Sequence, residues 1–166
     1  MNPPITRITV FRFLTLVALF ASLSFIFGNS LLPKGESASV SGGVQGMIES
    51  IVGEDSPIAE FFRLYLRKIA HITEFALLAI EVTLLRFLYD KRSLSFFIHS
   101  LSFGLLVAVT DESLQILSDR GPSVSDVLLD ASGYLVLAFV TEGIIMFTLY
   151  AMKKRAERKH TNVVRS

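Results

Sequence analysis

A run of twenty residues without a single charge, from Phe13 to Leu32, constrains the fold of this chain most strongly. At 1.5 Å per residue, such a run forms a helix about as long as a bilayer's hydrocarbon layer is thick. A cleaved signal peptide is the alternative, but the run is long for one and no clear small-x-small site follows Phe27. The sequence therefore predicts an uncleaved first membrane span.

The composition also favours a small membrane protein. The 166 residues are 51% hydrophobic and 19% charged, whereas soluble chains carry about 25% charged residues. Three more apolar segments follow, at about residues 69–85, 94–110 and 127–152. We therefore expect an all-α fold: one membrane domain, residues 1–166, forming a polytopic bundle of about four transmembrane helices.

Charge and cysteine content exclude several classes of protein. The net charge of +1 provides no overall basic field, so nucleic acid is not an expected partner. The lipid bilayer is an expected partner because of the apolar segments. The chain has no cysteine, which excludes disulfides, zinc–thiolate sites and a cysteine nucleophile.

Lysine and arginine residues near the span ends predict the orientation. They gather before the first span, between the second and third spans, and in a basic tail over residues 153–166. With four spans these three regions fall on one side of the membrane. We therefore predict that both termini are cytoplasmic.

The first outer loop, about residues 33–66, is acidic and has two parts. Residues 35–43 are rich in serine and glycine, which predicts a flexible segment. Residues 44–52 carry apolar side chains at helical spacing, which predicts a short helix on the outer membrane surface. Ser56 and Pro57 then resemble a helix cap followed by proline at the first helical position.

Ionisable residues within the spans are the candidate functional groups. At 100° per residue, Arg67, His71, Glu74 and Glu81 fall on one stripe of the second helix, with Lys68 at its edge. Charges inside a membrane are costly, so such side chains face the bundle and either pair or take part in chemistry.

The third and fourth helices add polar groups at the same predicted depth. Asp126 and Asp130 are four residues apart near the start of the fourth helix, and Gly133, on the same face, allows close approach of a helix or ligand. We expect one outward-facing polar pocket lined by His71, Glu74, Asp111, Glu112, Gln115, Arg120, Asp126 and Asp130.

Purely structural roles are the alternative for several of these residues. His71 and Glu74 would then pair with Lys68 or Arg120 to hold the bundle together. Asp126 would only cap the fourth helix. Glu142 lies on the opposite face from Asp126, and we expect it to be structural or paired with Arg86.

These polar motifs resemble those of the VanZ-like family over about residues 66–140. Residues 68–75, KIAHITEF, resemble its K-x-x-H-x-x-E-[FY] stretch, and residues 111–115, DESLQ, resemble its D-E-x-x-Q element. Arg120, Ser123, Asp126, Asp130 and Gly133 are similar to its third element. Asp130 stands where asparagine is common in the family and adds a charge.

The resemblance implies a small multi-pass protein of the bacterial cell membrane. The family's name-giving member is associated with low-level resistance to the glycopeptide teicoplanin. For this chain, the expected partners are a lipid-linked cell-wall precursor or a lipoglycopeptide.

Three functional hypotheses follow. In the first, the pocket binds a lipid-linked or glycopeptide-type ligand through Lys68, Asp111, Gln115, Arg120, Asp126 and Asp130. In the second, the protein is a metal-dependent intramembrane enzyme acting on a lipid-linked envelope substrate, with a divalent metal as cofactor. Its candidate catalytic residues are His71, Glu74 and Glu112, and its candidate metal ligands are Glu74, Glu112 and Asp126. A small transporter or proton-coupled carrier that uses Glu74 and Glu81 is the third hypothesis.

Overall fold

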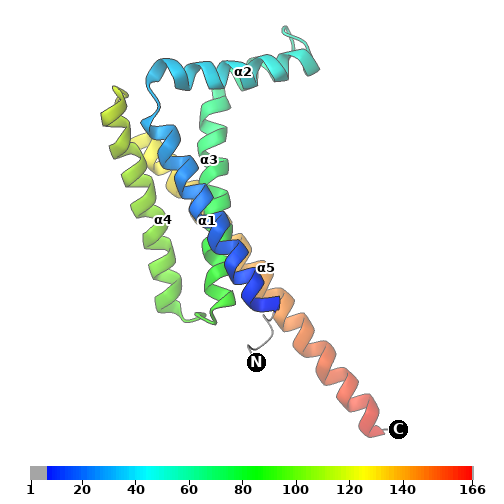
Figure 1. The fold of residues 1–166 in the computed structure, drawn as a ribbon. Coiled ribbons are helices and arrows are strands. Elements are labelled where there is room, and N and C mark those ends of the chain that lie inside the picture. Colours follow the sequence, from blue (N-terminus) through cyan, green and yellow to red (C-terminus); the bar gives the residue numbers. More distant parts are fainter. Residues whose placement is uncertain (1–6, 166) are drawn as a thin grey trace, which may run out of the picture.

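The computed structural model describes the backbone of residues 7–165 and the side chains of residues 7–158. All regular structure within these residues is helical, which confirms the predicted fold class. The elements are α1 (Arg7–Leu31), α2 (Lys34–Val52), α3 (Pro57–Leu88), α4 (Leu94–Gln115), the 3-10 turn η1 (Ile116–Ser118) and α5 (Val124–Arg165). Helices α1, α3, α4 and α5 form the bundle, and α2 lies across one end of it, hereafter the α2 end (Figure 1).

The bundle has the dimensions and composition of a multi-pass membrane protein. Three stretches of the described chain are long and apolar enough to cross a membrane: Arg7–Leu31, Leu94–Ser118 and Val124–Arg158. Helix α3 is also long, at 32 residues, but charged side chains recur along it. It packs among the other three helices, and its own crossing stays a prediction.

Small residues let the helices approach closely in the core. A Cβ atom on Gly104 of α4 would overlap the ring of Tyr134 on α5. The hydroxyl of Tyr134 donates a 2.8 Å hydrogen bond to the carbonyl oxygen of Ser100, which fixes the ring. A Cβ atom on Gly133 would lie 2.9 Å from the carbonyl oxygen of Ile72, so α5 meets the backbone of α3 there, as expected for this glycine.

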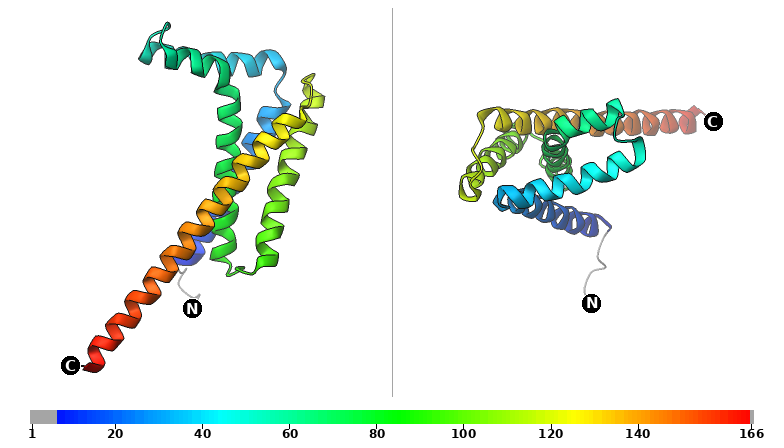
Figure 2. Two further views of the ribbon diagram at one scale, coloured as in Figure 1. Left: turned by 180° about the vertical axis from the view of Figure 1, so that it is seen from behind. Right: turned by 90° about the horizontal axis from the view of Figure 1, so that it is seen from above.

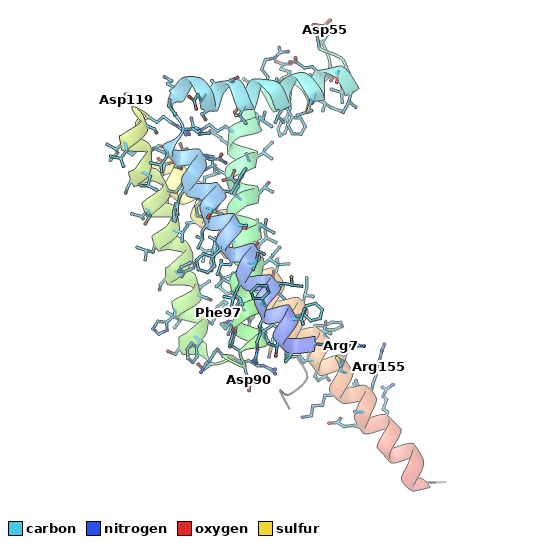
Figure 3. The ribbon with its side chains drawn as sticks, in the orientation of Figure 1. Arg7, Asp55, Asp90, Phe97, Asp119 and Arg155 are labelled. Atoms are coloured by element: carbon cyan, nitrogen blue, oxygen red, sulfur yellow. The ribbon has the colours of Figure 1, made fainter. Side chains whose placement is uncertain are left out.

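The three basic regions that predict the orientation lie at the end of the bundle opposite α2. Arg7 marks the first region, Asp90 marks the loop between α3 and α4, and Arg155 marks the tail (Figure 3). Asp55 and Asp119 lie at the α2 end (Figure 3). Arg12 donates two hydrogen bonds, of 2.9 and 2.7 Å, to the carbonyl oxygen of Leu88 at the last turn of α3. The three basic regions therefore share one end, as the charge pattern predicts.

The predicted pairing of Glu142 with Arg86 is confirmed by an ion pair between the two side chains. The pair joins α5 to the last turn of α3, and the Arg86 side chain is almost fully buried. From there α5 continues past the bundle as a straight extension (Figure 2).

Helix α2 corrects one prediction. Residues 35–43, expected to be flexible, are helical as part of an unbroken helix from Lys34 to Val52. The helix runs through these serines and glycines despite their weak helix propensity, and the second half of α2 contacts α3. The Gln45 amide donates a 3.2 Å hydrogen bond to the carbonyl oxygen of Ala59, and Arg63 pairs with Glu49 at 2.7 Å.

The start of α3 is as predicted. Pro57 occupies the first turn, and the Ser56 side chain accepts a 3.1 Å hydrogen bond from the backbone N–H of Ala59. This cap begins α3 well before its apolar part, and the first turns of α3 run alongside α2 before the helix turns into the bundle (Figure 2).

The attachment of α2 to α3 is expected to weaken in acid. The Gln45 amide and the Arg63 guanidinium hold the pKa of Glu49 below its ordinary value of 4.5. Because folding lowers this pKa, the carboxylate stabilises docking above pH 4.5, and the contribution is lost as the pH falls through the lowered pKa. The effect is small because Arg63, one partner of the ion pair, is more than half exposed to solvent. A spin label at Met47 should gain mobility as the pH falls below 4.5, and Glu49→Gln should remove this pH dependence. A label whose mobility is the same above and below pH 4.5 would contradict the prediction.

Candidate functional site

Three predicted site residues meet inside the α2 end of the bundle. Nδ1 of His71, on α3, lies 3.4 Å from Oδ1 of Asp130 on α5 and 3.9 Å from Oδ2 of Asp111 on α4. The two carboxylate side chains are 0% and 1% exposed, respectively, and the imidazole is 16% exposed. One donor atom from each residue lies within 4.8 Å of the others, which makes this trio a candidate metal centre.

Most polar atoms of this trio lack a hydrogen-bond partner in the described part of the chain. Ser30 of α1 donates a hydrogen bond to Oδ1 of Asp111. Nδ1 of His71, Oδ2 of Asp111 and both carboxylate oxygens of Asp130 have none. Buried polar groups are normally hydrogen-bonded, so this arrangement calls for a ligand or a second positive charge.

Glycine and helical spacing bring the trio together. Gly133 is three residues after Asp130 and therefore shares its face of α5. Its missing side chain lets α5 touch α3 at Ile72, which directly follows His71. This close approach places the Asp130 carboxylate within ion-pair distance of the His71 imidazole.

A second group of predicted residues forms a hydrogen-bond network beside the trio. Glu112 accepts a 2.6 Å hydrogen bond from the Gln115 amide and a 2.8 Å hydrogen bond from the backbone N–H of Ser123. The oxygen of the Gln115 amide accepts a 3.1 Å hydrogen bond from Arg67. Arg120 donates a 3.0 Å hydrogen bond to the carbonyl oxygen of Asn29. These bonds tie α1, α3 and α4 to the segment that leads into α5.

The other predicted residues are not members of the trio. Glu74 receives a 3.4 Å hydrogen bond from the Asn29 amide. Asp126 is in the first turn of α5, where the helix dipole stabilises a negatively charged carboxylate. Lys68 is exposed and does not line the cavities described below. The predicted metal ligands Glu74, Glu112 and Asp126 do not form a metal-sized group in the described chain.

Two adjoining cavities lie beneath α2. The first, about 250 Å³, lies between α1, α2 and α3 and has a mostly apolar lining, with His71 and Glu74 contributing polar groups. The second, about 370 Å³, is lined by four basic side chains and no acidic one. Arg67 and Arg120 line both cavities. The four basic residues are Lys34, Arg63, Arg67 and Arg120.

Sequence reasoning missed the contribution of α1. Asn29 and Ser30 contact Glu74 and Asp111, respectively, yet neither was selected as a site residue. They are adjacent polar residues near the end of an otherwise apolar span, which is the signal that points to them. The part played by α2 had no such signal, since its cavity-lining residues include ordinary serines and valines.

Fold and site together define a polytopic helical membrane protein with a buried polar cluster at one end of its bundle. The family model for VanZ/LLP1 matches residues 11–153, and the chain belongs to this family. The match extends on both sides of residues 66–140, where the motifs lie. No curated protein and no solved structure matches the chain.

Proposed function

We propose that this protein binds an anionic lipid-linked ligand in the paired cavities beneath α2, at the outer face of a bacterial cell membrane. The observation that carries the proposal is the pairing of a mostly apolar cavity with one lined by four basic side chains, of which only Arg63 is ion-paired within the described chain, with Glu49. An amphiphile with a phosphate or carboxylate head and an apolar tail has this same division.

The cationic cavity suits an anionic head group. Lys34 and Arg63 come from α2 and the start of α3, and Arg67 and Arg120 reach the same space from below. Guanidinium groups bind phosphate and carboxylate through paired, charge-assisted hydrogen bonds. Burial lowers the pKa of Arg120, but arginine keeps its charge throughout the physiological pH range.

The apolar cavity suits the first carbons of the tail. Phe25, Leu32, Val40 and Val44 line it from α1, α2 and the link between them. At about 250 Å³ it is smaller than most drug-sized sites. We therefore expect it to hold the part of a long chain next to the head group, with the rest of the chain in the bilayer.

The ligand has two candidate sources that share this chemistry: a lipid-linked cell-wall precursor and an acylated glycopeptide such as teicoplanin. Native mass spectrometry of the purified protein with a polyprenyl monophosphate, teicoplanin or phosphatidylcholine separates them. We expect one of the first two to bind in preference to the neutral phospholipid. If teicoplanin binds, a contribution to glycopeptide resistance is expected, measurable as a change in susceptibility when the protein is deleted.

Lys34→Gln is the sharpest test variant because the exposed Lys34 side chain lines the cationic cavity and forms no hydrogen bond or ion pair within the described chain. It should lower affinity roughly tenfold, the effect of losing one charged hydrogen bond. Lys91→Gln, an exposed lysine at the opposite end, is the matched control. Equal binding of anionic and neutral amphiphiles, or unchanged affinity in Lys34→Gln, would contradict the proposal.

A metal-dependent enzyme acting on a lipid-linked substrate is the second candidate function. One observation favours it: His71 and Glu74, an imidazole and a carboxylate one helical turn apart, both line the apolar cavity. In such an enzyme His71 would help to hold the metal, and Glu74 is suited to general acid–base chemistry beside it. Turnover of a polyprenyl diphosphate, followed by mass spectrometry and lost in His71→Gln, would favour this function; a bound but unchanged substrate would favour binding alone.

A further inference from the structure

We propose that His71, Asp111 and Asp130 form a binding site for one divalent transition-metal ion, Zn²⁺ or Mn²⁺. This site lies on the bundle side of the apolar cavity, which His71 also lines. The proposal goes beyond lipid binding and does not depend on it, because the ion would be held by the protein alone.

The spacing of the donor atoms fits a metal ion. The imidazole nitrogen lies 3.4 and 3.9 Å from the nearest oxygens of Asp130 and Asp111. All three donor atoms lie within 4.8 Å of one another. Ligand bonds of about 2.0–2.2 Å place neighbouring donors about 3–4 Å apart, so small side-chain movements would complete the site.

Burial and charge point to a ligand independently of spacing. Within the described chain, Asp130 is fully buried, and neither of its carboxylate oxygens has a hydrogen-bond partner; the same holds for Oδ2 of Asp111, which lies 3.9 Å from the imidazole nitrogen of His71. Two buried carboxylates are costly unless positive charge balances them. The imidazole supplies at most one such charge, whereas a divalent ion supplies both.

The nearby arginines do not balance the carboxylates. Arg67 donates its hydrogen bond to the Gln115 amide, and Arg120 donates to the carbonyl oxygen of Asn29. Neither forms an ion pair with Asp111 or Asp130. Within the described chain, His71 is therefore the only side chain that forms an ion pair with the two carboxylates.

The donor set selects the class of metal. One imidazole and two carboxylates suit Zn²⁺ or Mn²⁺, whereas Mg²⁺ and Ca²⁺ favour oxygen ligands alone and Cu(I) favours sulfur. The Ser30 hydroxyl, which holds the other oxygen of Asp111, would orient that ligand. Three protein ligands leave a coordination position open, as in catalytic zinc sites.

The test is metal content measured by mass spectrometry on the full chain in nanodiscs, after incubation with Zn²⁺ or Mn²⁺ and desalting. We expect about one ion per wild-type chain and almost none in Asp130→Asn. Asp126→Asn is the matched control, because Asp126 lies one turn earlier on the same helix and outside the trio. It should keep the ion.

Two results would overturn the proposal: wild-type protein that retains neither ion, or loss of the ion in Asp126→Asn as complete as in Asp130→Asn. If Asp130→Asn aggregates, electron spin echo spectra of Mn²⁺-loaded wild type decide the matter. Modulation from an imidazole nitrogen that disappears in His71→Gln supports the site. Bound Mn²⁺ without that modulation contradicts it.

Discussion

Gly133→Leu is expected to prevent the bundle from assembling in its native form. Even a Cβ atom at this position would lie 2.9 Å from the carbonyl oxygen of Ile72. That oxygen belongs to the α3 backbone and cannot turn aside, so α5 would have to move away from α3. Overpacking against flexible side chains costs about 1–3 kcal/mol, and contact with backbone should exceed that range.

The matched control is Gly143→Leu on the same helix, where an added Cβ atom would meet nothing within 4 Å. Because the chain has no tryptophan, thermal stability is best followed by size exclusion of a fluorescent fusion. Gly133→Leu should lose the monodisperse peak at much lower temperature than wild type, and Gly143→Leu should not. Equal stability of the two variants would contradict the close α3–α5 contact.

Glu112→Ala is expected to destabilise the protein by about 2 kcal/mol or more. Glu112 is 2% exposed, and its carboxylate accepts hydrogen bonds from the Gln115 amide and the backbone N–H of Ser123. Removing the carboxylate leaves both donors without their acceptor, and each unsatisfied buried group costs about 1–3 kcal/mol. The turn between α4 and α5 should loosen as a result.

This variant also separates two roles for Glu112. Ser113→Ala, a neighbouring exposed change, should alter stability by no more than about 0.5 kcal/mol and serves as the control. A structural role predicts a lower unfolding temperature in Glu112→Ala. Unchanged stability together with lost activity would instead favour the catalytic role that the sequence suggests.

Much of the fold could be predicted from hydropathy and charge, because both reflect physical costs that act on each residue separately. The uncharged run that became α1 and the basic residues that share one end of the bundle are examples. The pairing of Arg86 with Glu142 could also be predicted, because an isolated charge inside a span is costly and needs a partner of opposite charge.

The site could be predicted only in part, because side-chain partnership depends on how the helices pack. The topology inferred from loop charges placed His71, Asp111 and Asp130 at one depth. It could not show that Glu112, predicted at the same depth, lies outside their cluster. The partners of Asn29 and Ser30 could not be predicted, because they depend on how α1 packs beside α3 and α4. The helical state of residues 35–43 likewise did not follow from local propensity, because serine and glycine are weak helix formers.

The central claim is that the cavities beneath α2 open on the outer face of the membrane, and a single cysteine tests it most directly. The natural chain has no cysteine, so Ser39→Cys on exposed α2 and Ser93→Cys at the opposite end each provide one reactive group. The two variants are treated in intact cells with a membrane-impermeant maleimide. We predict labelling of Ser39→Cys in intact cells and of Ser93→Cys only after permeabilisation. The reverse pattern would contradict the orientation and, with it, the proposed access of a lipid-linked ligand from outside the cell.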